Sequence, residues 1–307
     1  MLLRILKDGR IDLSCLEEQV DAYAAAGVDG VYTNGTATEF HGQSDDAFAD
    51  ISTRVAQRCR EHGLPFQLGA THPLPMATLD RIRLIRSLSP GAIQVVLPDW
   101  VPVDLETASR FLSRCAVVAG DVGLVLYNPP HAKTVLTPTD FIALADAVPG
   151  LVGIKCGGGD AAWYEAMRPV LESLSVFIPG HFMATGSSRG AHGSYSNMAC
   201  LNPRATVAWN RQIKERPDDA MALERRIGRF MEKAISPILD SGYPGYACDK
   251  LMASVGGWAD ISPRLLWPHA GIPDRHKAEV RRWAEKLIPE FVEPTGTATT
   301  ETPHAEH

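Results

Sequence analysis

The chain has 307 residues, of which 45% are hydrophobic and 21% are charged, a balance typical of a globular protein that can bury a large core. Its formal net charge of −6 and its pI near 5.9, with basic residues scattered along the chain, argue against a nucleic-acid partner or an anionic membrane surface and favour a small-molecule partner. The six cysteines are widely spaced and no apolar run is long enough to cross a membrane, so we expect a cytoplasmic protein with neither a disulfide framework nor a membrane span.

The predicted elements alternate between short strands and amphipathic helices. The candidate strands cover residues 2–6, 30–34, 66–70, 92–97, 123–128, 151–156, 175–179 and 190–196. The first segment between them has Ser14 and Glu17 as a predicted capping box and Gly27 as a predicted C-cap. No G-x-G-x-x-G follows the first strand, so eight strand–helix pairs predict an α/β fold of the (β/α)8 TIM-barrel type rather than an open, doubly wound sheet.

Three regions are expected along the chain. Residues 1–202 should form the barrel, with a short first strand because that strand begins almost at Met1. The pattern of residues 203–290 is purely helical and predicts a C-terminal helical extension packed against the barrel. Residues 291–307 are poor in hydrophobic side chains and lack periodicity, so we expect a flexible tail.

A single lysine, Lys155, lies in the apolar strand "LVGIKC". Alternation along this strand predicts two faces, Leu151, Gly153 and Lys155 on one and Val152, Ile154 and Cys156 on the other. If the first face points into the barrel, burial lowers the pKa of Lys155 and leaves a neutral amine that can attack a carbonyl. The alternative is a strand-end lysine with a buried stem and a solvated ammonium group.

Two further strand ends carry candidate chemistry. Tyr127 ends the preceding strand, so its phenol should lie close to the Lys155 amine and could relay protons; the alternative is a capping aromatic with a solvated hydroxyl. The loop after the second strand offers backbone N–H groups and hydroxyls to a carboxylate, although it could be an ordinary turn: Gly35, Thr36, Ala37 and Thr38. Glu39 is expected to anchor this loop.

No metal or cofactor is expected. The histidines near predicted strand ends, such as His41 and His181, lack metal-ligand spacing, and the glycines at 157–159 lack the Lys-Ser/Thr of a phosphate-binding loop.

Several motifs together resemble a known family. "GTATEF", "YNPP", "GIK" and "GAHGSYS" are similar to those of the dihydrodipicolinate synthase and N-acetylneuraminate lyase family, pyruvate-dependent class I aldolases that are (β/α)8 barrels. The resemblance covers roughly residues 1 to 290. It implies that Lys155 forms a Schiff base with a 2-oxo acid, that Tyr127 relays protons, and that Thr36 binds the carboxylate and passes protons to Tyr127.

The same resemblance implies further features. Tyr195 falls where the family lines the pyruvyl pocket with a backbone carbonyl, and Gly180 falls near the substrate-facing loop. Family members form tetramers built from dimers, so we expect a homo-oligomer, either a dimer or a tetramer.

Other positions depart from the family pattern. Ala37 replaces a second hydroxyl residue, and Asp99 and Trp100 replace two tyrosines, the second of which crosses a subunit interface in the synthases. The arginine that binds the second substrate carboxylate is also missing, which leaves His131 or Lys133 as candidates. Authentic dihydrodipicolinate synthase activity is therefore not expected.

The favoured hypothesis is a Schiff-base lyase, either an aldolase or a dehydratase, that acts on a 2-oxo acid such as a 2-keto-3-deoxy sugar acid. One alternative is a non-catalytic or regulatory barrel that binds 2-oxo acids, which Ala37 and Trp100 favour and Lys155 disfavours. Another is a synthase-like condensation with a different aldehyde. A metal-dependent aldolase is disfavoured by the missing ligand cluster.

Overall fold

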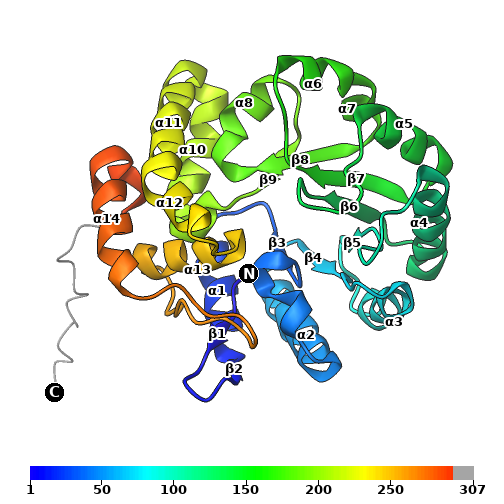
Figure 1. Ribbon diagram of the computed structural model, residues 1–307, viewed down its shortest axis with the longest axis horizontal. Coiled ribbons are helices and arrows are strands. Elements are labelled where there is room, and N and C mark those ends of the chain that lie inside the picture. Colours follow the sequence, from blue (N-terminus) through cyan, green and yellow to red (C-terminus); the bar gives the residue numbers. More distant parts are fainter. Residues whose placement is uncertain (293–307) are drawn as a thin grey trace, which may run out of the picture.

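The computed structural model of the protein describes residues 1–292, and a parallel seven-stranded sheet lies at its centre (Figure 1). In spatial and chain order its strands are β3 (Val31–Thr33), β4 (Phe66–Gly69), β5 (Ala92–Val96), β6 (Leu124–Asn128), β7 (Leu151–Cys156), β8 (Ser175–Pro179) and β9 (Gly193–Tyr195). Tyr32 from the first of these strands and Tyr195 from the last have ring centroids 5.1 Å apart. The sheet therefore curls into a nearly closed barrel, which confirms the predicted TIM-barrel fold.

Helices surround this sheet (Figure 1). They are α1 (Ser14–Ala26), α2 (Asp45–Glu61), α3 (Pro75–Arg86), α4 (Leu105–Ala119), α5 (Pro138–Ala147), α6 (Ala161–Ala166), α7 (Arg168–Ser173) and α8 (Met183–Ser188). Strand side chains such as Ile93, Leu126 and Ile154 pack with helix side chains such as Ile51 and Leu112 in one buried cluster. Each such side chain contributes about 1.5–3 kcal/mol through burial, and this layer holds the helices against the barrel wall.

The prediction of a first barrel strand at residues 2–6 was wrong, and so was the count of eight barrel strands. Instead, β1 (Arg4–Ile5) pairs antiparallel with β2 (Ile11–Asp12) in a separate two-stranded sheet. Gly9, at φ 85°, permits the tight turn between them. The N–H of Leu2 donates to Gln19 Oε1 at 2.9 Å, and Gln19 Nε2 donates to the carbonyl of Leu2 at 2.7 Å. These two backbone groups are therefore not free to pair with a neighbouring barrel strand.

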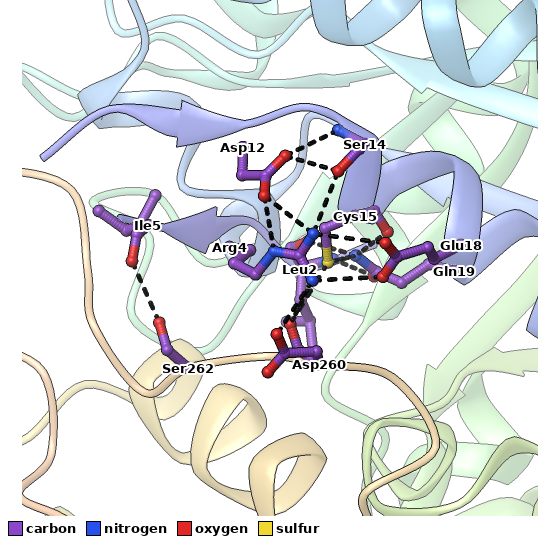
Figure 2. Close-up of polar contacts among 10 residues, drawn as sticks. All are labelled: Leu2, Arg4, Ile5, Asp12, Ser14, Cys15, Glu18, Gln19, Asp260 and Ser262. Atoms are coloured by element: carbon purple, nitrogen blue, oxygen red, sulfur yellow. Dashed lines mark hydrogen bonds and ion pairs between the residues drawn. The ribbon is translucent and has the colours of Figure 1, made fainter. Parts of the chain in front are cut away.

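Polar contacts attach this hairpin to the C-terminal part of the chain (Figure 2). Arg4 donates from Nε to Asp12 Oδ2 at 3.0 Å and from Nη1 to the carbonyl of Asp260 at 3.2 Å. The Ser262 hydroxyl donates to the carbonyl of Ile5 at 3.2 Å. The N-terminal hairpin is thereby held against residues 260–262 of the C-terminal part of the chain.

The predicted capping box at Ser14 was also wrong. Leu13 is the N-cap of α1, and the N–H and hydroxyl of Ser14 both donate to Asp12 Oδ1, at 3.1 and 2.7 Å. The strand residue Asp12 thus competes successfully for the serine that the sequence pattern assigned to the cap. Gly27 ends the helix in the left-handed conformation, at φ 77°, as predicted.

The remaining helices form the predicted C-terminal extension, beside the barrel in Figure 1. They are α9 (Met198–Leu201), α10 (Pro203–Glu215), α11 (Pro217–Phe230), the π-helical η4 (Met231–Ile235), α12 (Ser236–Asp240), α13 (Gly245–Gly256), α14 (Arg275–Leu287) and η5 (Pro289–Phe291). Trp209, Phe230 and Phe291 are buried in their own cluster. The predicted flexible tail was wrong at its first residue, because Phe291 ends η5 and is buried, and from residue 293 on the tail lies outside the described residues.

Two findings bear on the expectations from composition. All six cysteines are free, and five of them are buried. Within residues 1–292, no helix combines the length and the apolar character that crossing a membrane requires.

Candidate active site

The inner face of the barrel is polar and aromatic. The neighbours of Tyr127 and Lys155 along their strands, such as Leu126 and Ile154, pack outward in the core cluster, so these two side chains point inward. The same alternation turns Tyr32 (β3), Gln67 (β4), Gln94 (β5) and Tyr195 (β9) toward the interior.

The Lys155 amine lies among three tyrosine rings. Its Nζ is 4.1 Å from the ring centroid of Tyr127, 4.9 Å from that of Tyr195 and 5.7 Å from that of Tyr32. Tyr127 and Lys155 are direct register partners on β6 and β7, which confirms that the two strand ends bring them together. Lys155 as a whole residue is half-buried, with its amine against these rings.

Burial lowers the pKa of Lys155 from its ordinary 10.5 to about 8, while the nearby charges of Asp249 and Cys200 act in the opposite direction. At pH 7 roughly one amine in ten is then neutral, against roughly one in 3,000 for an ordinary lysine. This pKa leaves a usable fraction of neutral amine, which is the form that can attack a carbonyl.

The alternation predicted for β7 holds only from Gly153 onward. Leu124 pairs with Leu151 but Val125 pairs with Gly153, so the ladder has an irregularity that passes over Val152. Leu151 packs outward in the core cluster with Ile154, and Val152 is 45% exposed. The faces assigned to Leu151 and Val152 were therefore wrong, because a bulge resets the side-chain alternation.

The loop after β3 places Thr36 against Tyr127. Thr36 begins the short 3-10 helix η1 (Thr36–Thr38), and its side chain lies near enough to the Tyr127 phenol to lower the pKa of that phenol. Burial raises the pKa of Tyr127 to about 12, the charge of Asp249 adds to this rise, and the Thr36 side chain opposes it. Gly35 leaves room for a ring, since a Cβ there would lie 2.5 Å from Tyr32.

Thr38 is used inside the protein. Its N–H donates to the carbonyl of Gly35 at 3.1 Å and its hydroxyl to the carbonyl of Met1 at 2.8 Å. The first N–H groups of a helix have no partner within it, so Thr36 and Ala37 carry the donors of η1 that a bound anion could use.

Glu39 anchors this loop, as predicted. Its Oε2 accepts from the N–H of Leu266 at 2.6 Å, and its Oε1 pairs with the Lys250 ammonium at 2.6 Å. The side chains of Glu39 and Lys250 are both fully buried. Glu39 is thus occupied by structural partners and is not a free base.

The other predicted site residues lie apart from Lys155 or have structural partners. His131 and Lys133 are exposed in the loop after β6, where the N–H of Lys133 donates to Asp99 Oδ1 at 2.8 Å. Trp100, in the loop after β5, is 86% exposed, and its indole carries no hydroxyl that could relay a proton. Gly180 is buried so close to Ser196 that a Cβ would lie 2.2 Å from its hydroxyl oxygen.

Several residues near Lys155 were missed by sequence reasoning. Tyr195 and Tyr32 are held by hydrogen bonds, with the Tyr195 hydroxyl donating to Gln67 and the amide of Gln94 donating to the Tyr32 hydroxyl. Tyr195 was predicted only through its backbone; the missed ones include Tyr32, Gln67, Gln94, Cys200 and Asp249. A usable signal existed for Asp249 alone, because "DK" at 249–250 interrupts an otherwise small and apolar helix.

Across residues 1–292, no three His, Cys, Asp or Glu side chains lie close enough together to bind a metal ion.

The comparisons with known proteins decide the family. Residues 1–239 match the model of the dihydrodipicolinate synthetase family.

The chain belongs to the dihydrodipicolinate synthetase family.

Curated relatives are distant. An "uncharacterized DapA-like lyase" of Thermococcus onnurineus is 24% identical over 92% of this chain and 95% of its own length. A 4-hydroxy-tetrahydrodipicolinate synthase of Leptothrix cholodnii is 28% identical over 66% of this chain and 69% of its own length. These low identities agree with the expectation that this member is not an authentic dihydrodipicolinate synthase.

Solved structures share the fold. YagE, a prophage protein of E. coli K12 solved in complex with pyruvate, superposes with a TM-score of 0.82 at 18% identity and covers 93% of this chain and 96% of its own. A sialic acid aldolase of Ruminococcus gnavus, solved as a catalytic lysine mutant, has a TM-score of 0.80 at 16% identity and covers 95% of both chains. Members of this family are pyruvate-dependent lyases that form a Schiff base.

Proposed function

We propose that this protein is a class I lyase in which Lys155 forms a Schiff base with a 2-oxo acid. The observation that carries the proposal is the position of the Lys155 amine, 4.1 Å from the ring centroid of Tyr127 and with a pKa lowered to about 8. The neutral amine adds to the ketone carbon, the carbinolamine loses water, and the resulting iminium withdraws electrons from the adjacent carbon.

The roles of the neighbouring residues follow from the same chemistry. Tyr127 carries protons to and from the carbinolamine oxygen, and the effect of the nearby Thr36 side chain on the pKa of the Tyr127 phenol supports a relay between the two hydroxyls. The substrate carboxylate is held by the N–H groups of Thr36 and Ala37 at the start of η1, with Gly35 giving the close approach. Tyr195 and Gly180 border the pyruvyl pocket.

The substrate is proposed to be a 2-keto-3-deoxy sugar acid or a related compound derived from pyruvate. His131 and Lys133, on the exposed loop after β6, are the candidate contacts for the distal part of the substrate. Both carbon–carbon cleavage and loss of water are open to an iminium with a hydroxyl on the carbon two positions away from it. The six free thiols fit the proposed cytoplasmic location, since thiols persist in a reducing compartment.

Trapping with a reductant tests the Schiff base. The protein is incubated with pyruvate and sodium borohydride and digested, and the peptide that contains Lys155 is expected to gain the mass of the reduced adduct. Lys155→Ala should abolish the adduct while the melting temperature stays near that of the wild type, and Lys214→Ala, at an exposed lysine of α10, is the matched control. An unmodified Lys155 peptide after trials with pyruvate and a panel of 2-oxo acids would reject the proposal.

A second measurement divides the two lyase chemistries. The protein is given 2-keto-3-deoxy sugar acids, and pyruvate release and water loss are followed separately. Pyruvate release identifies an aldolase, whereas a new 2-oxo acid of unchanged carbon number identifies a dehydratase.

We also propose a homo-oligomer. Leu74 and Met76 near the start of α3, and Trp100 and Val101 after β5, are large apolar residues exposed by more than half of their surface. They follow adjacent strands, β4 and β5, so they belong to neighbouring loops at one end of the barrel, which is the kind of surface that a second copy would cover.

A further inference from the structure

Helix α13 approaches the Lys155 site from the C-terminal extension. It packs against η1, which carries Thr36, and against α9. Ala253 of α13 is buried in a small cluster with Ala37 and Cys200 alongside it. Residues four apart lie on one face of a helix, so Asp249 is on the same face as Ala253, toward the loop that carries Thr36.

The rotation of α13 is set by the residue next to Asp249. Lys250 is fully buried, and its ammonium pairs with Glu39 Oε1 at 2.6 Å and also donates to the carbonyl of Arg264. Glu39 belongs to the same loop as Thr36. The ion pair therefore fixes the orientation of α13 relative to the loop, and with it the direction of the Asp249 side chain.

Asp249 faces a specific set of groups. Its negative charge favours the protonated forms of two amines, that of Lys155 and the α-amine of Met1. The same charge opposes ionisation of the Tyr127 phenol and the Cys200 thiol, so it raises the pKa of each. Burial raises the pKa of Asp249 to about 6, and the charge of Lys155 lowers it. The carboxyl group is therefore largely ionised at pH 7. The remaining ionisable groups beside the Lys155 amine are the phenols of Tyr32 and Tyr195.

We propose that Asp249 is a positioning residue for Lys155, a buried counter-charge that the C-terminal helices supply to the barrel and that stabilises the cationic forms of the lysine nitrogen. The inference rests on the proposed function, because its consequence for activity is the stabilisation of the Lys155 iminium. The free amine is neutral, whereas the ammonium and the iminium each carry one positive charge. A carboxylate therefore favours both cations over the free amine.

This sign gives a distinctive pH signature. Removal of the charge lowers the pKa of Lys155 further, because the charge of Asp249 raises it. Below the pKa, imine formation exchanges one cation for another, so the equilibrium with pyruvate changes little. Above the pKa, the imine must gain a proton, so its stability falls about ten-fold for each unit of pKa lost. General damage to the site would weaken the imine at both pH values.

The first test measures Lys155 itself and needs no substrate. Competitive labelling with acetic anhydride between about pH 6 and pH 11, read on the Lys155 peptide by mass spectrometry, gives the midpoint for the neutral amine. We expect this midpoint to fall by about one pH unit or more in Asp249→Asn and to stay near the wild-type value in Asp249→Glu. Asp240→Asn, an exposed aspartate of α12, is the matched control and should leave the midpoint unchanged. An unchanged midpoint in an Asp249→Asn variant of native melting temperature would overturn the inference.

The second test measures the imine. The pyruvate concentration that gives half-maximal trapping is compared at about pH 6 and about pH 9.5, with cyanoborohydride as the reductant. In Asp249→Asn it should rise about ten-fold at the higher pH and stay near the wild-type value at the lower pH. An equal rise at both pH values would contradict the inference.

The two failures are distinguishable. A wild-type protein that yields no adduct rejects the Schiff-base function but leaves the labelling test of Asp249 intact. A wild-type protein that yields the adduct, together with unaltered labelling in Asp249→Asn, rejects the role of Asp249 alone.

Discussion

Lys155 lies near the end of a barrel strand, and its amine is surrounded by three aromatic rings. Burial is the largest influence on its pKa, which falls to about 8. The tyrosine rings offer their faces to the ammonium form, an attraction of about 0.5–2 kcal/mol that partly offsets the desolvation. As a result, the neutral and the protonated forms of the amine are both present near neutral pH.

This balance predicts a pH profile. Because the pKa of Lys155 is lowered, the neutral amine is present above about pH 8 and becomes about ten-fold scarcer for each unit below it. The initial rate of adduct formation with pyruvate should therefore rise about ten-fold per unit between pH 6 and 8 and level off above pH 8. Single-turnover trapping with cyanoborohydride measures it. A rate that keeps rising up to about pH 10.5 would mean an ordinary, solvated lysine.

Tyr127 has a separable role at the same scale. Its phenol keeps its proton well beyond neutral pH, since burial raises its pKa to about 12, and it can therefore act as a proton donor. Tyr127→Phe should keep the fold and the adduct on Lys155 but slow its formation by about 10²–10⁴-fold. Quenched-flow mass spectrometry gives the rate. Tyr164→Phe, a buried tyrosine of α6, is the control and should not change it.

At the scale of elements, two segments far apart in sequence build one wall of the site. The η1 loop carries Thr36 and α13 carries Asp249, and the fully buried pair of Glu39 and Lys250 joins them. Removal of one partner of a buried pair leaves an uncompensated charge, which costs about 3–5 kcal/mol.

Lys250→Met should therefore lower the free energy of unfolding by about 3–5 kcal/mol, measured by urea denaturation. Lys214→Met, at an exposed lysine of α10, is the matched control and should change it by less than about 0.5 kcal/mol. The double variant Glu39→Gln/Lys250→Met should recover part of the loss, since neither charge remains buried. If the double variant loses as much free energy of unfolding as Glu39→Gln and Lys250→Met together, the two side chains are not coupled and the pair does not hold α13 against the η1 loop.

At the scale of the whole molecule, the exposed apolar residues after β4 and β5 form the proposed interface between two copies of the chain. Trp100 is the largest of them and the most exposed. An aromatic side chain in the centre of an interface typically contributes about 2 kcal/mol or more to association.

Trp100→Glu should shift the protein toward a smaller species, because a charge at the interface is costly to desolvate. Light scattering coupled to size-exclusion chromatography at micromolar concentration measures the mass. Val117→Glu, on an exposed apolar residue of α4, is the control and should keep the wild-type mass. A monomeric wild-type protein would refute the homo-oligomer.

Local signals in the sequence were enough for most of the barrel. The alternation of short β-rich runs with segments of helical length predicted every strand of the seven-stranded sheet, with β7 and β8 at their observed bounds. They failed at residues 2–6, because strand propensity does not say which partner is available. There the Gln19 side chain and β2 took the backbone groups instead.

The inward direction of Lys155 and its pairing with Tyr127 could be read from the sequence, because strand periodicity and the order of a parallel barrel are local or sequential rules. Asp249 could not be placed in this way. It lies 94 positions beyond Lys155 (249 − 155) on a helix outside the barrel, and only the packing of α13 on η1 brings its charge to the amine. The sequence thus determined most of the barrel and its candidate nucleophile, while the tertiary structure alone decided which charges surround that lysine, since electrostatic fields act through space and not along the chain.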